Sequence, residues 1–391
     1  MKKTKFALLY LNEIQYDDLA WEFACRDYDA EILVSGISIY SNSAQDAETI
    51  KGILRENNVD VVFTTDFSPA TSMACKELGI RYVSWIYDAP QEGLFDPSVT
   101  NDCNFIFSFD KRQVKETLAR GARNVYHLPL ATNAYRNLRL VIEPEDEMRF
   151  GCDVSFVGNM YSENLYESIT SRVGEETKKE VDELIEEAYG KWDGIDRIFG
   201  RLSDKALEEL WSYVREGLPA DYSVDHDSYF ASGLTSKYLS FKERTAIVNS
   251  LLDYGIRLYT GDKGAQVPEA IWGGKLSYDD ELPKLYFLSR VNLNITLHCI
   301  TSGIPLRVFD IMGVGGFMLT NYQPEIEELF KIGENIEVYH SIEECRDKAD
   351  FYLKHEESRQ RIALNGYKLV SKEHNIGRRL DYILEKAGIV I

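Results

Sequence analysis

The sequence predicts an α/β protein built from two Rossmann-like domains. Short apolar runs alternate with helix-patterned segments between residues 5 and 131, and a second series of strand and helix signals begins near residue 153. Strands of a parallel sheet are buried on both faces, so they occur as short, nearly continuous apolar runs of this kind. The length of 391 residues is enough for two domains of ordinary size, each with its own core.

The N-terminal half has a βαβ pattern. Its helix-patterned segments, 44–56 and 111–120, combine apolar residues at helical spacing with charged faces. Asp110 directly precedes the second segment, where a carboxylate most simply caps the helix. We expect this domain at residues 1–135, followed by a polar linker at 136–152. The expected strands are 6–11, 61–65, 81–87, 104–109 and 125–130.

The C-terminal half is expected to hold a second domain at residues 153–375, with a helical insert at about 162–250. The insert is rich in charged helix-forming residues and is too long for a simple βα connection. It could hold an acceptor, a partner or a second copy of the chain, or it could be a solvated helical cover, and the sequence leaves these alternatives open. A last helix at 376–391 is expected to pack back on the first domain.

Residues 292–330 are the most informative stretch. A short apolar strand is followed by a helix whose first turn is expected to hold Pro305, with Ser302 or Thr301 as its cap. Gly313 is expected to end this helix, and Gly315-Gly316 would let the backbone pass close to a ligand before the next strand. Such an arrangement presents helix N-termini to a phosphate-bearing ligand.

Arg307 and Asp310 are three residues apart and therefore share one face of that helix. A guanidinium group there can bind a diphosphate, and a carboxylate can accept hydrogen bonds from two sugar hydroxyls. The same spacing is equally consistent with a surface ion pair of little energetic value.

Composition excludes several other classes. A net charge of -20 argues against nucleic-acid binding, which needs a basic surface.

The apolar run near the N-terminus is short and is expected to be a first strand rather than a signal peptide, and no apolar segment approaches the roughly 20 residues of a membrane-spanning helix. The six cysteines have no metal-ligand spacing, nor does His226 between two aspartates, so we expect a cytoplasmic protein without a metal site.

The segments GIPLRVFD, at 303–310, and GGFMLTN, at 315–321, resemble a GIPxRxFDxxxxGGFxLTN pattern. This pattern is found in the bacterial CgeB-like group, which comprises spore maturation protein B and its relatives and belongs to the GT-B glycosyltransferases. The segments Trp85 to Pro90 and Asp153 to Asn159 also resemble that group and the wider superfamily. The resemblance implies two facing Rossmann-like domains, the first for an acceptor and the second for a nucleoside diphosphate sugar.

The resemblance also implies a set of donor contacts. Asp310 matches the residue that binds the nucleotide ribose, whereas Ser302 stands where many superfamily members have a glutamate, so the stereochemical outcome cannot be carried over. His298 could contact a phosphate or the transferred sugar, although a buried structural histidine is the commoner situation. The expected contacts are Gly158, Asn159, His298, Ser302, Arg307, Asp310, Gly315, Gly316 and Asn321.

Two residues are expected to take part in the chemistry. Arg307 would stabilise the charge that grows on the departing diphosphate. Asp88, which follows the strand at 81–87, would deprotonate an acceptor hydroxyl if the enzyme inverts. The alternative for Asp88 is a cap of the turn before Pro90.

The resemblance therefore implies a metal-independent, hexosyltransferase-like enzyme that uses a nucleotide sugar, with UDP-sugar as the family-level expectation and no permanently bound cofactor. The acceptor is a protein, a polysaccharide or a small molecule, and a homo-oligomer through the insert is a further expectation. The alternatives are a non-catalytic GT-B scaffold or assembly protein and a sugar-nucleotide epimerase of the same fold.

Overall fold

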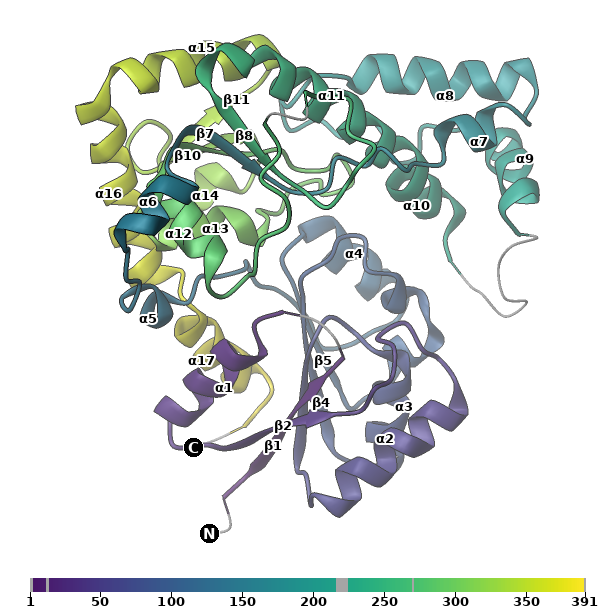
Figure 1. Ribbon diagram of the computed structural model, residues 1–391. Coiled ribbons are helices and arrows are strands. Elements are labelled where there is room, and N and C mark those ends of the chain that lie inside the picture. Colours follow the sequence, from purple (N-terminus) through teal and green to yellow (C-terminus); the bar gives the residue numbers. More distant parts are fainter. Residues whose placement is uncertain (1–2, 12–13, 216–223, 269–270, 390–391) are drawn as a thin grey trace. The chain divides into compact units, whose positions relative to one another are not determined.

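The computed structural model describes residues 3–11, 14–215, 224–268 and 271–389 (Figure 1). The chain divides into two compact units. The first contains Met1–Ala131 together with His374–Ile391, and the second contains Thr132–Glu373. Each unit has its own parallel sheet and its own hydrophobic core.

The sheet of the first unit has the order β2-β1-β3-β4-β5-β6, and all its strand pairs are parallel. The predicted apolar runs form five of these strands. The sequence did not predict β2, because this edge strand is mostly exposed and carries charged side chains. The strands are β1 Lys5–Tyr10, β2 Asp29–Val34, β3 Val61–Thr65, β4 Arg81–Ile86, β5 Asn104–Ser108 and β6 Val125–His127.

Helices cover both faces of this sheet. On one face, Phe23 of α1 packs against Phe6 with their ring centroids 4.8 Å apart, and Tyr382 of α17 contacts Phe107. On the other face, α2 and α3 pack their apolar residues against the strands. The C-terminal helix α17 thus belongs to the first unit. The helices are α1 Tyr16–Cys25, α2 Ala44–Glu56, α3 Pro69–Leu78, α4 Lys111–Ala119 and α17 Ile376–Lys386.

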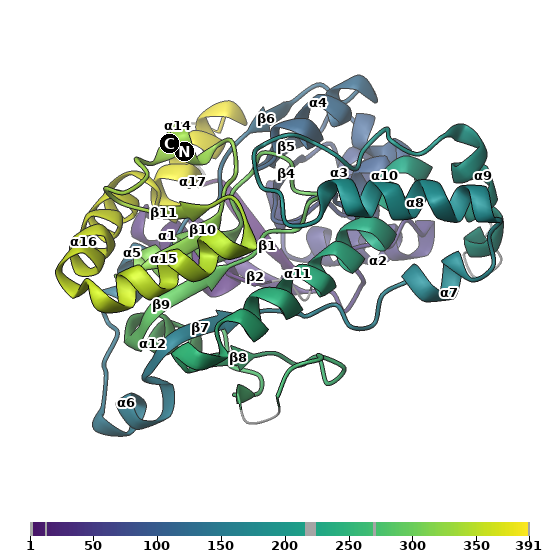
Figure 2. The ribbon, with the colours of Figure 1, turned by 90° about the horizontal axis from the view of Figure 1, so that it is seen from above.

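The sheet of the second unit has the order β11-β10-β9-β7-β8, again with parallel pairs (Figure 2). Helices α11 and α15 lie together on one face, and α12 and α13 pack against the strands from the other. The strands are β7 Cys152–Val157, β8 Ile256–Tyr259, β9 Ser289–Asn294, β10 Met318–Asn321 and β11 Glu337–Tyr339. The helices named here are α11 Lys237–Ser250, α12 Glu281–Leu288, α13 Leu306–Gly313 and α15 Ile342–Lys354.

The helical insert lies between β7 and β8 (Figure 1). Its helices share an apolar cluster that includes Val181 of α8, Leu210 of α9 and Phe230 of α10, so they pack on one another around a core. Residues 216–223 of the predicted insert lie outside the described residues. The helices before α11 are α7 Tyr166–Thr170, α8 Glu175–Ala188, α9 Asp204–Val214 and α10 His226–Phe230.

The segment predicted as a polar linker contains two short helices, α5 Ala134–Asn137 and α6 Pro144–Phe150. Phe150 is almost fully buried beside Leu285 of α12. The remaining helices of the second unit are α14 Ile326–Leu329 and α16 Glu356–Glu373. Within the described ranges, every helix is too short or too polar to cross a lipid bilayer.

The predicted start of the helix after β9 is wrong. Helix α13 begins at Leu306 with Pro305 in the N-cap position, so neither Ser302 nor Thr301 caps it. Proline can stand there because its fixed φ and missing N–H group cost nothing at a helix start. The predicted end is confirmed, since α13 ends at Gly313 and Gly315 then adopts a positive φ of 86°.

Two helical glycines give a matched test of the packing. A Cβ atom on Gly366 of α16 would lie 2.5 Å from the carbonyl oxygen of Asn335, whereas one on Gly52 of α2 would meet nothing within 4 Å. We expect Gly366→Ala to lower the unfolding temperature, because a backbone clash costs about 1–3 kcal/mol. Gly52→Ala should raise it, because alanine gains about 0.5–1 kcal/mol in a helix. Thermal unfolding followed by circular dichroism measures both unfolding temperatures. If the two substitutions change the unfolding temperature equally, the close packing of Gly366 against Asn335 is wrong.

Candidate functional site

The candidate site lies where the strands of the second unit end. Gly158 follows β7, Asn294 ends β9 and Asn321 ends β10. Because these strands are parallel, their carboxyl ends lie at one edge of the sheet, and this edge is where α/β proteins bind ligands.

Two guanidinium groups converge beside Gly158. This glycine has a φ of 156°, and a Cβ atom on it would lie 3.5 Å from Nη2 of Arg307 and 3.6 Å from Nη1 of Arg244. The bare backbone therefore leaves space at the point that both cations approach. Arg307 was predicted from the sequence, and Arg244 was not.

Arg244 reaches this point from α11, the helix that ends the insert. Its side chain is almost fully buried, and it donates hydrogen bonds to the carbonyl oxygens of Asn159 and Ile295, the latter at 2.5 Å. Its Nε atom is buried without a hydrogen-bond partner in the part of the chain that the structure describes. Burial lowers the pKa of Arg244 to about 10, and repulsion from Arg307 acts in the same direction.

Neither Arg244 nor Arg307 forms an ion pair with a carboxylate among the described residues. Burying a cation without a counter-charge is costly, and an anion bound at the same place removes that cost. The pair therefore forms a site with the charge and the space for an anionic ligand.

Arg307 is held by a buried network of amides and hydroxyls. Its Nη1 donates to Oδ1 of Asn294 at 3.2 Å. The Asn294 amide is fixed in this orientation because its Nδ2 donates to the hydroxyls of Thr296 and Thr320, each at 2.9 Å. Asn321 belongs to the same network, since its Oδ1 accepts from the backbone N–H of Thr296. Asn321 thus positions the strand ends.

A polar cavity of about 560 Å³ lies at the ends of β7 and β8. Asn159 connects this cavity to Arg244, because it lines the cavity and its carbonyl oxygen accepts a hydrogen bond from Arg244. The stem of Lys275 lies directly over Gly261, where a Cβ atom would be only 2.0 Å from its Cε. The lining residues are Asn159, Glu163, Thr260, Gly261, Asp262, Lys263 and Lys275.

Asp310 lies one turn after Arg307 on α13 and is mostly buried. Its Oδ2 accepts a hydrogen bond from the hydroxyl of Tyr278 at 3.0 Å. Tyr278 follows the cavity residue Lys275 by three positions in the same loop, which brings that loop to α13.

His298 contacts the insert. Its Nε2 lies 2.8 Å from Oε1 of Glu243, a fully buried carboxylate that also accepts from the N–H of Gly190 at 2.8 Å. The indole ring of Trp192 stacks on the imidazole at 6.1 Å. A small cavity of about 30 Å³ is lined by His298 and Trp192 and by the loops that follow β9 and β10.

Three of the predicted contacts make interactions within the second unit instead of lying beside the arginine pair: Ser302, Gly315 and Gly316. The hydroxyl of Ser302 donates to Oε1 of Glu325 at 2.7 Å. Gly315 and Gly316 follow the far end of α13, just before β10. A Cβ atom on Gly316 would lie 2.5 Å from the carbonyl oxygen of Tyr286, so packing within the unit explains this glycine. We leave Gly315 and Gly316 out of the proposed site.

Asp88 lies in the first unit, after β4. Asp66, in a left-handed conformation with a φ of 61°, holds this turn because its Oδ1 accepts from the N–H groups of Tyr87 at 2.8 Å and Asp88 at 3.1 Å. The next helical turn, Glu92–Phe95, has Gln91 at its N-cap. Asp88 is exposed as a residue. Protein atoms around its carboxyl group nevertheless remove water from it, and this desolvation raises the pKa of Asp88; repulsion from Glu92 raises the pKa further.

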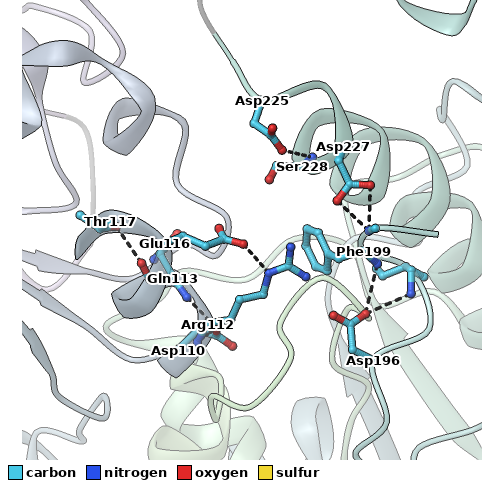
Figure 3. A network of polar contacts seen from close by, with 12 residues as sticks. Asp110, Arg112, Gln113, Glu116, Thr117, Asp196, Phe199, Asp225, Asp227 and Ser228 are labelled. Atoms are coloured by element: carbon cyan, nitrogen blue, oxygen red, sulfur yellow. Dashed lines mark hydrogen bonds and ion pairs between the residues drawn. The ribbon is translucent and has the colours of Figure 1, made fainter. Parts of the chain in front are cut away.

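Other polar groups have structural roles (Figure 3). In the first unit, Asp110 caps α4 as predicted, accepting from the N–H groups of Arg112 at 3.0 Å and Gln113 at 3.2 Å. In the insert, Asp225 caps α10 by accepting from the N–H of Ser228, and Asp227 accepts from Gly200. In the described ranges no three His, Cys, Asp or Glu side chains are grouped as metal ligands would be.

Sequence reasoning missed Arg244, Glu243, Trp192 and Tyr278. The first three lie in the insert, whose sequence shows only helical periodicity and charge.

Comparisons with known proteins bear on the fold. Residues 249–385 match a family model described as glycosyl transferase-like, which is less than half of the chain. Among curated proteins, none matches the sequence. Solved structures resemble the whole chain. Anabaena Alr3699/HepE in complex with UDP has 10% identity and a TM-score of 0.53, with 99% of this chain and 100% of that chain covered.

Two further solved structures resemble the whole chain to a similar degree. The T4 phage BGT complex with its UDP-glucose substrate has 11% identity and a TM-score of 0.52, covering 98% of this chain and 99% of that chain. A glycosyltransferase from Rickettsia africae has 11% identity and a TM-score of 0.52, covering 99% and 98% respectively. Together with the two parallel sheets, these likenesses confirm the predicted fold class: the chain has the α/β GT-B fold, with two Rossmann-like domains.

The space beside Gly158 can be tested with inorganic pyrophosphate as the probe. In Gly158→Ala the added methyl group occupies the place that both guanidinium groups approach, so we expect pyrophosphate affinity to fall about tenfold or more. Gly255→Ala is the control, because that glycine also has a positive φ, of 67°, but meets nothing within 4 Å. Isothermal titration calorimetry measures both; unchanged affinity in Gly158→Ala would show that the anion binds elsewhere.

Proposed function

We propose that this chain is a glycosyltransferase that transfers a sugar from a nucleoside diphosphate sugar to an acceptor hydroxyl. The observation that carries the proposal is the pair of guanidinium groups, Arg244 and Arg307, beside the bare backbone of Gly158. The family-model match over residues 249–385 supports the same reaction class.

The arginine pair suits the chemistry of the leaving group. When the bond between the sugar and the diphosphate breaks, negative charge grows on the departing oxygen. Fixed cations in a site with little water stabilise that charge, and guanidinium groups match phosphate oxygens in geometry. Arg307 and Arg244 supply this charge from the protein itself, so the proposed reaction is metal-independent.

The nucleoside would occupy the polar cavity. Its volume of about 560 Å³ exceeds the lower limit of typical ligand pockets, and its lining residue Asn159 binds Arg244. Asp310, held by Tyr278, would accept the ribose hydroxyls. Anabaena HepE and T4 phage BGT were solved with UDP and UDP-glucose, so a UDP-hexose is the donor to test first.

Asp88 is the proposed general base. Its carboxylate makes no hydrogen bond to the described residues, and its raised pKa makes it a better proton acceptor. Asp66 fixes the backbone that carries it.

The narrower family of the chain, its location and its partners are also part of this proposal. The GIPLRVFD and GGFMLTN segments support membership of the CgeB-like group. The cytoplasmic location, the acceptor and an oligomer through the insert stay predictions.

A thermal-shift screen tests the donor site. We expect one donor among UDP-, GDP- and dTDP-sugars to stabilise the protein, by about 2.7 kcal/mol at a concentration of 100 times Kd, and a response to a CMP-sugar alone would contradict a diphosphate site. Arg307→Ala and Asp310→Ala should abolish the shift, whereas Arg361→Ala, on the exposed face of α16, should retain it. No response to any donor would contradict the proposal. Chromatography of the products then distinguishes the three functions. A glycosyltransferase gives a glycosylated acceptor, an epimerase gives an isomerised donor, and a scaffold leaves the donor unchanged.

A further inference from the structure

The loops of the second unit follow one another along the sheet edge in a definite order. The polar cavity lies at the ends of β8 and β7, and the two arginines lie between the ends of β7 and β9. His298, in the loop that follows β9, lines the small cavity together with residues of the loop that follows β10. A nucleoside diphosphate sugar bound along this edge, with its nucleoside in the cavity and its diphosphate at the arginines, has its sugar near His298.

The helical insert builds the surroundings of His298. Glu243 of α11 contacts Nε2 of the imidazole, and Trp192, from the segment between α8 and α9, stacks on its face. The backbone N–H of Gly190 fixes Oε1 of Glu243, while Oε2 is buried without a hydrogen-bond partner among the described residues. A buried carboxylate and a stacked indole hold an imidazole ring in one orientation.

We propose that the insert helps to select the transferred sugar, with Glu243 as the positioning residue that aims His298 at a sugar hydroxyl. The inference rests on the proposed function, since it requires a nucleotide sugar at the arginine pair. It gives the insert a role in the donor site, whereas the sequence left the insert as an acceptor site, an interface or a cover.

The chemistry follows from the tautomer. A carboxylate only accepts hydrogen bonds, so Nε2 of His298 carries the hydrogen that Glu243 accepts. Nδ1 has no hydrogen-bond partner among the described residues and, in the neutral ring, presents a lone pair to a donor such as a hydroxyl group. The cavity beside the ring, about 30 Å³, has room for a group of that size.

The test compares the affinities of UDP, UDP-glucose and UDP-galactose for the full chain by isothermal titration calorimetry. In His298→Gln the amide lies near the position of Nε2, so the contact with Glu243 is kept and the Nδ1 function is lost. In His298→Asn the amide lies near the position of Nδ1, so the Nδ1 function is kept and the contact with Glu243 is lost. Glu243→Gln keeps an oxygen that accepts from His298, and Glu243→Leu removes it. Glu186→Gln, on the exposed face of α8, is the matched control.

We expect wild type to bind one UDP-sugar more tightly than UDP. His298→Gln and Glu243→Leu should reduce that preference about 3- to 10-fold, the effect of one hydrogen bond, with UDP affinity unchanged within about twofold. Glu243→Gln should retain most of it and Glu186→Gln all of it, whereas His298→Asn, which loses the contact with Glu243, should show a reduced preference as Glu243→Leu does. Because a merely destabilised protein would lose both ligands together, the ratio of the two affinities reports the sugar contact.

Three results would overturn the inference. Equal weakening of UDP and the UDP-sugar in His298→Gln would place His298 at the phosphates. An unchanged preference in both His298→Gln and Glu243→Leu would show that the insert has no part in sugar selection, while leaving the proposed function intact. If wild type binds neither UDP nor a UDP-sugar, the proposed function fails with this donor class, and the inference fails with it.

Discussion

The meeting of two cations at a bare stretch of backbone is the constraint on which the second unit depends. Arg244 and Arg307 come from different helices, and their guanidinium groups approach the same side of Gly158 without a carboxylate partner among the described residues. Such an arrangement is unfavourable unless an anion completes it. The features around it, from the Asn294 network that fixes Arg307 to the carbonyl groups that bind Arg244, keep the two cations in place.

Helix α11 connects the insert to this site. Two adjacent residues of opposite charge leave it in different directions: Glu243 to His298, and Arg244 to the carbonyls that follow β7 and β9. The insert has a core of its own, yet its last helix also packs on the sheet. A change in the insert can therefore alter the surroundings of the arginine pair and of His298 without touching the strands of the sheet.

The sequence predicted those parts that depend on local patterns. The strand Val61–Thr65 and the helix Ala44–Glu56 match their predicted bounds, because a buried apolar run and an amphipathic period are local signals. Strand β2 was missed because an exposed edge strand lacks such a run. Arg307 was found through its motif, but Arg244 lies 63 residues away in α11, and only tertiary structure brings the two together. The cap of α13 was misplaced because Ser302 binds Glu325 instead.

The most direct test of the arginine site is a crystal structure of the chain with UDP bound. The account predicts that the phosphate oxygens lie within hydrogen-bond distance of the guanidinium groups of Arg244 and Arg307, close to the backbone of Gly158, and that the ribose lies at Asp310. A UDP molecule bound elsewhere in the chain, with the two arginines untouched, would contradict it.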